Sequence, residues 1–231
     1  MTGPVVLALE TATEWCSVAI RIGTQTRALA ERNPQGHSEL ILPMVQRLLA
    51  EAELPLHRCS VVAVGRGPGS FTALRIGVGV AQGLAYGAGL PVAPVSSLQA
   101  LALQFEAPRV LTVLDARMHE VYWAAYVRDA EGIPRPCGEV RVSAPAELRC
   151  PETAAWLVVG NGAEAYREVL EHALAPAAPH FVSGAYPRAA EVARLGALDF
   201  LAGKVMPPAL AAPEYVRMRV THAHQGPGVG H

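Results

Sequence analysis

Positive charge is scarce in this chain of 231 residues. Lysine and arginine together number 19 against 20 acidic residues, which gives a formal net charge of −1, and Lys204 is the only lysine. A protein that grips nucleic acid by itself does so through a basic excess that neutralises phosphates, and this sequence has none. We therefore expect any role in nucleic-acid chemistry to run through a partner protein.

Long apolar runs and clustered cysteines are also absent. No run reaches the ~18 residues that a membrane-spanning helix needs, so the sequence predicts no membrane segment. Cys16, Cys59, Cys137 and Cys150 lie far apart, and Met1 leads almost directly into a predicted strand rather than into a signal peptide. These features predict a cytoplasmic protein with free thiols.

Signatures of two enzyme classes are missing as well. The nucleophile elbow Gly-x-Ser-x-Gly does not occur. A metal site of the two-histidine type on the predicted helix at 37–53 would need histidines at i and i+4, but His37 is followed at that spacing by Ile41, so we interpret His37 as a capping or surface residue. The remaining histidines, which lack the rigid platform of a metal site, include His222, His224 and His231. We predict no metal site and no catalytic residue.

The sequence does contain a glycine-rich loop between a strand and a helix. Residues 67–77 read Gly-Pro-Gly-Ser-Phe-Thr-Ala-Leu-Arg-Ile-Gly, after an apolar strand at 60–64. Such a loop presents backbone N–H groups at a helix N-terminus, where an anion can bind and where Ser70 or Thr72 could cap the helix. A phosphate-binding P-loop continues with lysine and then serine or threonine, and Phe71 and Ala73 stand here instead.

Two interpretations of this loop remain. It could make a weak anion or nucleotide contact through Gly67, Gly69, Ser70 and Thr72. Alternatively it is a tight strand-to-helix turn that only sets the direction of the following helix. We favour the turn because the lysine that phosphate transfer needs is missing.

The chain repeats one pattern twice, which indicates two related lobes. An apolar strand that ends in an acid, a short turn and a second strand occupy residues 5–22, and the same order returns at residues 110–127. Each unit continues with another apolar strand and a glycine turn, at residues 61–67 and 157–162. The sequence thus predicts an α/β fold built from a duplicated β-hairpin plus strand-loop-helix unit.

Composition and the positions of proline and glycine divide the chain further. With 51% hydrophobic residues the chain can bury two cores of about 100 residues each. We predict an N-terminal lobe over residues 1–105, a C-terminal lobe over 106–220 around a shared cleft, and a flexible tail over 221–231. The helices that we expect lie at residues 37–53, 72–87, 163–173 and 189–202.

Glu10 and Asp115 stand at equivalent places, each at the end of the first strand of its lobe. They could bind a cation together in the cleft, or they could be turn-forming acids inherited from the duplication. We favour turns, because two carboxylates repel each other without a third ligand or a substrate. Asp115 is followed by Ala116 and Arg117, and a turn explains this sequence better than an acid beside an arginine electrophile.

The two helices of the first lobe carry more apolar and small residues than one buried face needs. On the helix at 37–53 the apolar positions cover an arc of about 200°, roughly twice the width of one core face. On the helix at 72–87, Gly79, Gly83 and Gly87 recur every four residues, although glycine costs up to ~1 kcal/mol per helical position. This glycine stripe could lie against the sheet of its own lobe, or it could admit a partner helix.

The residue pattern leaves both possibilities open. The family resemblance described next favours the second, because it implies that the two helices form a partner or dimer interface. Its residues are expected to be Leu40, Met44, Arg47, Leu48, Arg75, Gly79, Gly83 and Gly87.

Four stretches carry a family resemblance. They are the undecapeptide at 67–77, the stretch Asp-Ala-Arg-Met-x-Glu-Val-Tyr-Trp at 115–123, Gly-Asn-Gly-Ala at 160–163 and Pro-Glu-Tyr-Val-Arg at 213–217. Together they resemble the bacterial TsaB (YeaZ) family. The likeness spans almost the whole chain. Glu10 stands where the family usually has aspartate and Ala73 where it usually has glycine, and the longer acid argues against nucleotide chemistry.

The resemblance implies a two-lobed actin-like fold of the sugar kinase, Hsp70 and actin (ASKHA) type and a non-catalytic paralogue of TsaD. Such a protein would dimerise with the catalytic TsaD-type subunit, work with the ATPase subunit TsaE, and support threonylcarbamoyl transfer to an anticodon-loop adenosine of tRNA. It would contact tRNA only through the complex, form a homodimer when alone, and require no cofactor, with weak nucleotide binding left open. The alternatives are a small-molecule kinase or phosphatase of the same fold, with Glu10 and Asp115 around magnesium, and a metallopeptidase-like protein.

Overall fold

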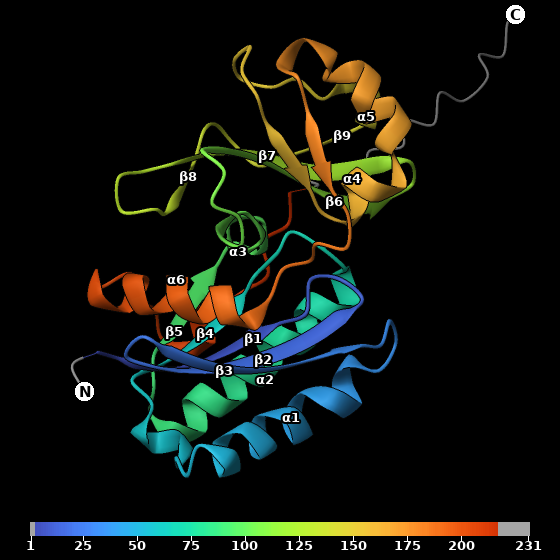
Figure 1. Ribbon diagram of the computed structural model, residues 1–231. Helices are drawn as coiled ribbons and strands as arrows, with labels where there is room; N and C mark the ends of the chain where they lie inside the picture. Colours follow the sequence, from blue (N-terminus) through green and yellow to red (C-terminus); the bar gives the residue numbers. More distant parts are fainter. Residues whose placement is uncertain (1–2, 217–231) are drawn as a thin grey trace, which may run out of the picture.

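The computed structural model describes residues 3–216, which form two α/β lobes, each built on one sheet (Figure 1). In the first lobe the sheet order is β3-β2-β1-β4-β5. Its strands are β1 (Val5–Glu10), β2 (Trp15–Ile22), β3 (Gln25–Arg32), β4 (Val61–Gly65) and β5 (Val92–Val95). Two long helices, α1 (His37–Glu51) and α2 (Phe71–Ala88), lie side by side on one face of this sheet (Figure 1).

The second lobe follows the short helix α3 (Ser97–Leu103) and has the sheet order β11-β10-β6-β7-β8, with β9 paired to β7. Its strands are β6 (Arg109–Arg117), β7 (Glu120–Arg128), β8 (Pro134–Pro136), β9 (Arg141–Ser143), β10 (Leu157–Val159) and β11 (His180–Val182). Its helices are α4 (Asn161–Ala165) and α5 (Arg167–Ala173).

The pairing of the strands confirms the duplication. In the first lobe β1 pairs antiparallel with β2 and parallel with β4, and β4 pairs parallel with β5. In the second lobe β6 takes the place of β1: it pairs antiparallel with β7 and parallel with β10, which pairs parallel with β11. Two copies of one mixed sheet give the predicted actin-like α/β fold.

The central strands of the first lobe are continuously apolar because both faces of the sheet are covered. Alternate residues of β1 and β4 enter two different cores, one beneath α1 and α2 and one beneath α6 (Ala189–Leu201). Leu7 and Leu9 belong to the first core, whereas Val6 and Ala8 belong to the second. A strand buried on both faces needs apolar residues at every position rather than at alternate ones.

Helix α6 crosses back from the second lobe to the first. The sequence placed this helix within residues 106–220, but in the structure it packs on β1, β2, β4 and β5, on the face opposite α1 and α2 (Figure 1). Gly196 permits this close packing, because an added Cβ would collide with the Cβ of Ala63 in β4. The boundary at residues 105 and 106 stays a prediction, and the tail at 221–231 lies outside the described residues.

Several contacts hold the segment that leads into α6. Gly184 N donates to Glu164 Oε2 in α4 at 3.3 Å, and the Tyr186 and Trp15 rings stack with centroids 4.1 Å apart. Ala189 N donates to Ser17 Oγ at 3.0 Å, in β2 of the first lobe. The two lobes are therefore joined by two crossings of the chain.

Other features of the fold also differ from the expectation. Strand β3 was not predicted, because all but one of its residues are exposed and it shows no apolar alternation. The helix expected at 163–173 is divided into α4 and α5 at Tyr166, whose φ of −119° and ψ of 28° interrupt the helix. Within residues 3–216, no helix combines the length and the apolar composition of a membrane span.

Candidate functional site: a cleft and a helical face

The glycine loop packs against the turn of the first hairpin. Ser70 N donates to the carbonyl oxygen of Ala12 at 2.8 Å, and a Cβ on Gly69 would collide with that same oxygen. Ser70 is the N-cap of α2, but its side chain makes no capping hydrogen bond, so the predicted side-chain cap from Ser70 is wrong. The loop residues fit the requirements of a close-packed turn, in line with the interpretation that we favoured.

Glu10 is buried behind this loop rather than directed into the cleft. It is 1% exposed, its Oε1 accepts from Ala12 N and its Oε2 accepts from Ser97 Oγ, both at 2.7 Å. Ser97 Oγ in turn accepts from Gly67 N at 3.2 Å. One carboxyl group thus ties the hairpin turn, α3 and the glycine loop together.

The electrostatics of Glu10 follow from this position. Burial raises the pKa of the carboxyl group above its ordinary value of 4.5, and the hydrogen bonds from Ala12 and Ser97 oppose the rise without cancelling it. An acid whose folded-state pKa is raised stabilises the fold below its unfolded pKa, and this contribution is lost as the pH rises through the folded-state pKa.

A Glu10→Gln variant is therefore expected to change the pH dependence of stability. Glutamine has nearly the same shape and does not titrate, so the free energy of unfolding of the wild type minus that of the variant should fall as the pH rises above about 4.5. Urea unfolding of both proteins between pH 4 and pH 8 measures this difference. A difference that stays constant over that range would show that Glu10 is not the buried titrating group described above.

Asp115, the equivalent acid of the second lobe, makes its contacts within the turn that follows it. Its Oδ1 accepts from Arg117 N at 2.9 Å and its Oδ2 lies 3.4 Å from Arg117 Nη1. Asp115 lines the cleft and Glu10 does not. The geometry agrees with two turn-forming acids, and within residues 3–216 no three His, Cys, Asp or Glu side chains gather as a metal site.

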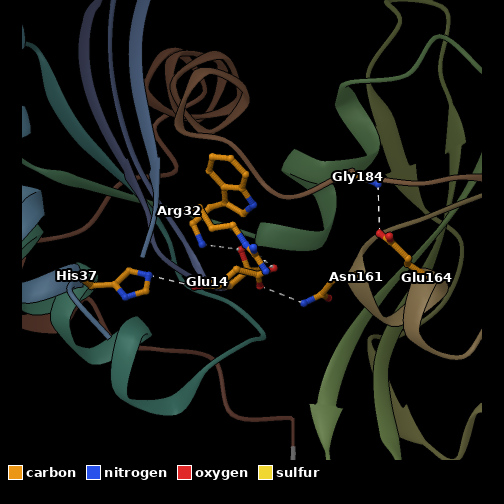
Figure 2. Close-up of polar contacts among 8 residues, drawn as sticks. Glu14, Arg32, His37, Asn161, Glu164 and Gly184 are labelled. Carbon is orange, nitrogen blue, oxygen red and sulfur yellow. Dashed lines mark hydrogen bonds and ion pairs between the residues drawn. The ribbon is translucent and has the colours of Figure 1, made fainter. Parts of the chain in front are cut away.

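The cleft between the lobes has a volume of about 790 Å³, within the usual range of small-molecule pockets. Figure 2 shows Glu14 of the first lobe facing Asn161 of the second, with Asn161 Nδ2 3.5 Å from Glu14 Oε2. Asn161 Oδ1 also accepts from Asp115 N at 3.0 Å. The walls come from the first hairpin turn, the start of α2, the end of β6 and residues 214–216.

His37 has a structural role that the sequence did not indicate. We expected a capping or surface residue, but the side chain is only 3% exposed, and its Nε2 donates to the carbonyl oxygen of Thr13 at 3.0 Å (Figure 2). The start of α1 is thereby fixed to the hairpin turn that forms one wall of the cleft. The prediction failed because Thr13 is distant in sequence.

The glycine stripe of α2 faces away from the body of the lobe. Gly79, Gly83 and Gly87 are exposed, and a Cβ added to any of them would meet no atom within 4 Å. The alternative in which this stripe lies against its own sheet is therefore excluded. Nothing in the described chain uses the close approach that these glycines permit.

The structure buries some of the predicted interface residues on α1 and leaves others at the surface. Met44 is 8% exposed and Leu48 is 1% exposed, and both belong to the core of the first lobe, so their assignment to a partner surface is wrong. The reason is that α1 packs against both β2 and α2, and a helix with two neighbours in its own lobe needs a wide apolar arc. Leu40 is partly buried against the same core.

The other predicted residues lie at the surface. Arg47 is exposed and pairs with Glu51 at 2.7 Å, and Arg75 is exposed at the N-terminal end of α2. The sequence analysis missed three large exposed side chains of the same two helices, which are Leu42, Phe71 and Tyr86. Tyr86 is 82% exposed and stands next to Gly87, and this pairing of a large exposed aromatic with the stripe was a signal that could have found it.

Comparison with known proteins gives consistent matches over nearly the whole chain. The family model of TsaD, described as tRNA N6-adenosine threonylcarbamoyltransferase, matches residues 29–223. The "tRNA threonylcarbamoyladenosine biosynthesis protein TsaB" of Haemophilus influenzae is 37% identical over 229 residues, which cover 93% of this chain and 94% of that protein. The protein of the same name from Escherichia coli is 43% identical over 171 residues, covering 71% and 74%.

Solved structures agree with these matches. The structure described as YeaZ from Pseudomonas aeruginosa superposes with a TM-score of 0.83 at 35% sequence identity, covering 92% of this chain and 99% of that one. A second structure from the same organism, described as an uncharacterized protein with similarity to peptidase YEAZ, gives a TM-score of 0.86 at 36% identity, covering 93% and 100%.

Proposed function

This chain belongs to the TsaB (YeaZ) family of tRNA threonylcarbamoyladenosine biosynthesis proteins, and we propose that it is the non-catalytic subunit that dimerises with a TsaD-type catalytic subunit. In that role it supports threonylcarbamoyl transfer to an adenosine in the anticodon loop of tRNA. Its contribution is to hold the catalytic subunit in a competent arrangement, and it contacts tRNA only through the complex, in the cytoplasm.

The exposed glycine stripe on α2 is the observation that carries this proposal. Each helical glycine costs up to ~1 kcal/mol relative to alanine, and no close contact within residues 3–216 at Gly79, Gly83 or Gly87 offsets this cost. Because these positions carry no side chains, the backbone of a partner helix could approach α2 closely and pack against the stripe. Leu42 and Tyr86, which are exposed on the same helix pair, would be covered at the same time.

The TsaD-type subunit suits this surface because it is a paralogue. Residues 29–223 match the TsaD family model, so the catalytic subunit is expected to carry an equivalent pair of helices on its own first lobe. Two such pairs related by a pseudo-twofold axis form a four-helix interface, and two copies of this chain would form a similar interface when the partner is absent. A stable interface buries about 800 Å² or more of the surface of each partner. The ATPase TsaE would join the assembled pair.

Mass measurement by light scattering tests this proposal. The chain alone is expected to have the mass of a homodimer, and an equimolar mixture with a TsaD-type subunit is expected to have the mass of one copy of each. A chain that stays monomeric alone and in the mixture would contradict the proposal.

We propose further that the cleft needs no nucleotide cofactor and binds ATP weakly at most. Two observations support this: the loop at 67–72 lacks the phosphate-binding lysine, and the Glu10 carboxyl group is engaged with Ala12 and Ser97 instead of facing the cleft. Calorimetric titration of the isolated chain with ATP and magnesium should give a dissociation constant no tighter than about the millimolar range. Tight binding with turnover would favour a kinase or phosphatase.

A further inference from the structure

The last described residues of the chain run along α2 in the opposite direction. Met206 bridges to Val92 just beyond the C-terminal end of α2. Farther along, the carbonyl oxygen of Ala211 accepts from Gln82 Nε2 at 2.9 Å, and the hydroxyl of Tyr215 accepts from Arg75 Nε at 3.0 Å near the N-terminal end. Residues 207–216, here named the C-terminal strap, therefore follow nearly the whole length of the helix.

A cluster of three side chains fixes the end of the C-terminal strap. The guanidinium carbon of Arg75 lies 3.6 Å from the centre of the Phe71 ring, and the Phe71 and Tyr215 rings are tilted with centroids 5.6 Å apart. Glu214 adds an ion pair to Arg66 at 3.2 Å and a backbone hydrogen bond to the Arg66 carbonyl oxygen at 2.8 Å. Phe71, Arg75 and Tyr215 also line the cleft between the lobes, and Phe71 and Tyr215 remain 54% and 46% exposed, so residues 3–216 hold this cluster in place without covering it.

The glycine stripe lies between the C-terminal strap and α1. At ~100° per residue, Gln82 and Arg75, which bind the strap, fall on one flank of α2. Val80 and Leu84 fall on the other flank and pack against the first-lobe core. The stripe therefore forms the bottom of a groove on the surface of α2. Helix α1 borders this groove on one side, and the C-terminal strap, with its exposed Leu210, borders it on the other.

We propose that the C-terminal strap is one wall of the groove that receives a helix of the TsaD-type subunit, and that Phe71, Arg75 and Tyr215 contact that helix directly. This inference rests on the function proposed above and adds a segment, 207–216, that lies far from α1 and α2 in the sequence. The groove fits a helix with small residues where it crosses the glycines. Tyrosine and arginine are the residue types that most often dominate binding energy at such surfaces.

The positive charge of Arg75 further indicates what kind of helix the groove would bind. Within residues 3–216, Arg75 has no carboxylate partner, because its contacts are the Phe71 ring and Tyr215. A cation held on an ordered aromatic platform at the edge of an apolar groove is complementary to an acidic side chain. The docked helix of the TsaD-type subunit is therefore expected to place a carboxylate against Arg75.

Calorimetric titration of the full chain with a TsaD-type subunit tests the inference. Tyr215→Ala and Arg75→Glu are each expected to weaken binding about tenfold or more, whereas Tyr215→Phe, which keeps the ring, should weaken it less. Leu201→Ala, which alters an exposed apolar side chain on α6 on the other face of the sheet, is the matched control and should bind like the wild type. Hydrogen exchange at residues 207–216 should slow in the complex.

The outcomes separate this inference from the function on which it rests. If Gly83→Leu abolishes binding while Tyr215→Ala and Arg75→Glu bind like the wild type, the strap is not part of the surface and the inference is wrong. Unchanged hydrogen exchange at residues 207–216 in the complex would overturn it as well. If Gly83→Leu also binds like the wild type, the proposed assembly itself fails.

Discussion

Replacing Gly83 with leucine is expected to weaken binding to a TsaD-type subunit by at least about 100-fold, or about 3 kcal/mol. Gly83 lies in the middle of the exposed stripe, where a leucine side chain would fill the space that we assign to the partner helix. The monomer should not be destabilised, because an added Cβ meets no atom within 4 Å and leucine favours the helix by up to ~1 kcal/mol over glycine, so stability is compared at concentrations where the chain is monomeric. Calorimetric titration and thermal unfolding measure the two effects separately.

Ala202→Leu provides the control for Gly83→Leu. Ala202 is exposed at the C-terminal end of α6, on the opposite face of the first sheet, so this variant gains leucine bulk away from the proposed groove. It should bind the partner like the wild type. Equal binding by both variants would mean that no helix packs against the stripe.

Replacing Gly196 with valine is expected to lower the free energy of unfolding by about 3 kcal/mol, near the upper end for overpacked cores. A Cβ at this position would collide with the Cβ of Ala63, so α6 would be pushed away from β4. The loss would be felt by the core that includes Val6, Ala8 and Val192. Urea unfolding measures the change.

Gly79→Val is the matched control for this variant. Gly79 also lies inside a helix, but an added Cβ meets nothing within 4 Å, so valine there should change the stability of the monomer, measured at low protein concentration, by no more than about 0.5 kcal/mol. Similar losses for the two variants would mean that the close packing of α6 on the first sheet does not determine the effect.

Much of the fold could be predicted from the sequence because its signals are local. The apolar strands at Val5–Glu10 and Arg109–Arg117 are buried from both sides, so their continuous apolar character is visible without any knowledge of their neighbours. The repeated order of hairpin, strand and glycine turn then gave the two lobes. Strand β3 was not predicted, because its exposed residues are mostly polar or charged and show no such pattern.

The site was harder to predict because it depends on contacts between distant segments. The wide apolar arc of α1 suggested an outer face, but Met44 and Leu48 are used within the lobe, because α1 packs on α2 as well as on the sheet. His37 binds Thr13, and Arg75 binds Tyr215 across 140 positions of sequence. The spacing of the three glycines placed them on one side of α2 but did not tell whether that side faces the sheet or the surface, and the structure shows that it faces the surface.

Quantification of threonylcarbamoyladenosine in tRNA by mass spectrometry tests the central claim most directly. A TsaD-type subunit and TsaE would be supplied with substrates and with the wild-type chain, with no chain, or with the Gly83→Leu variant. We expect modification with the wild-type chain and little or none in the other two reactions, although the variant is folded. Full modification without the chain, or with Gly83→Leu, would contradict the claim that this protein acts by docking its α2 face on the catalytic subunit.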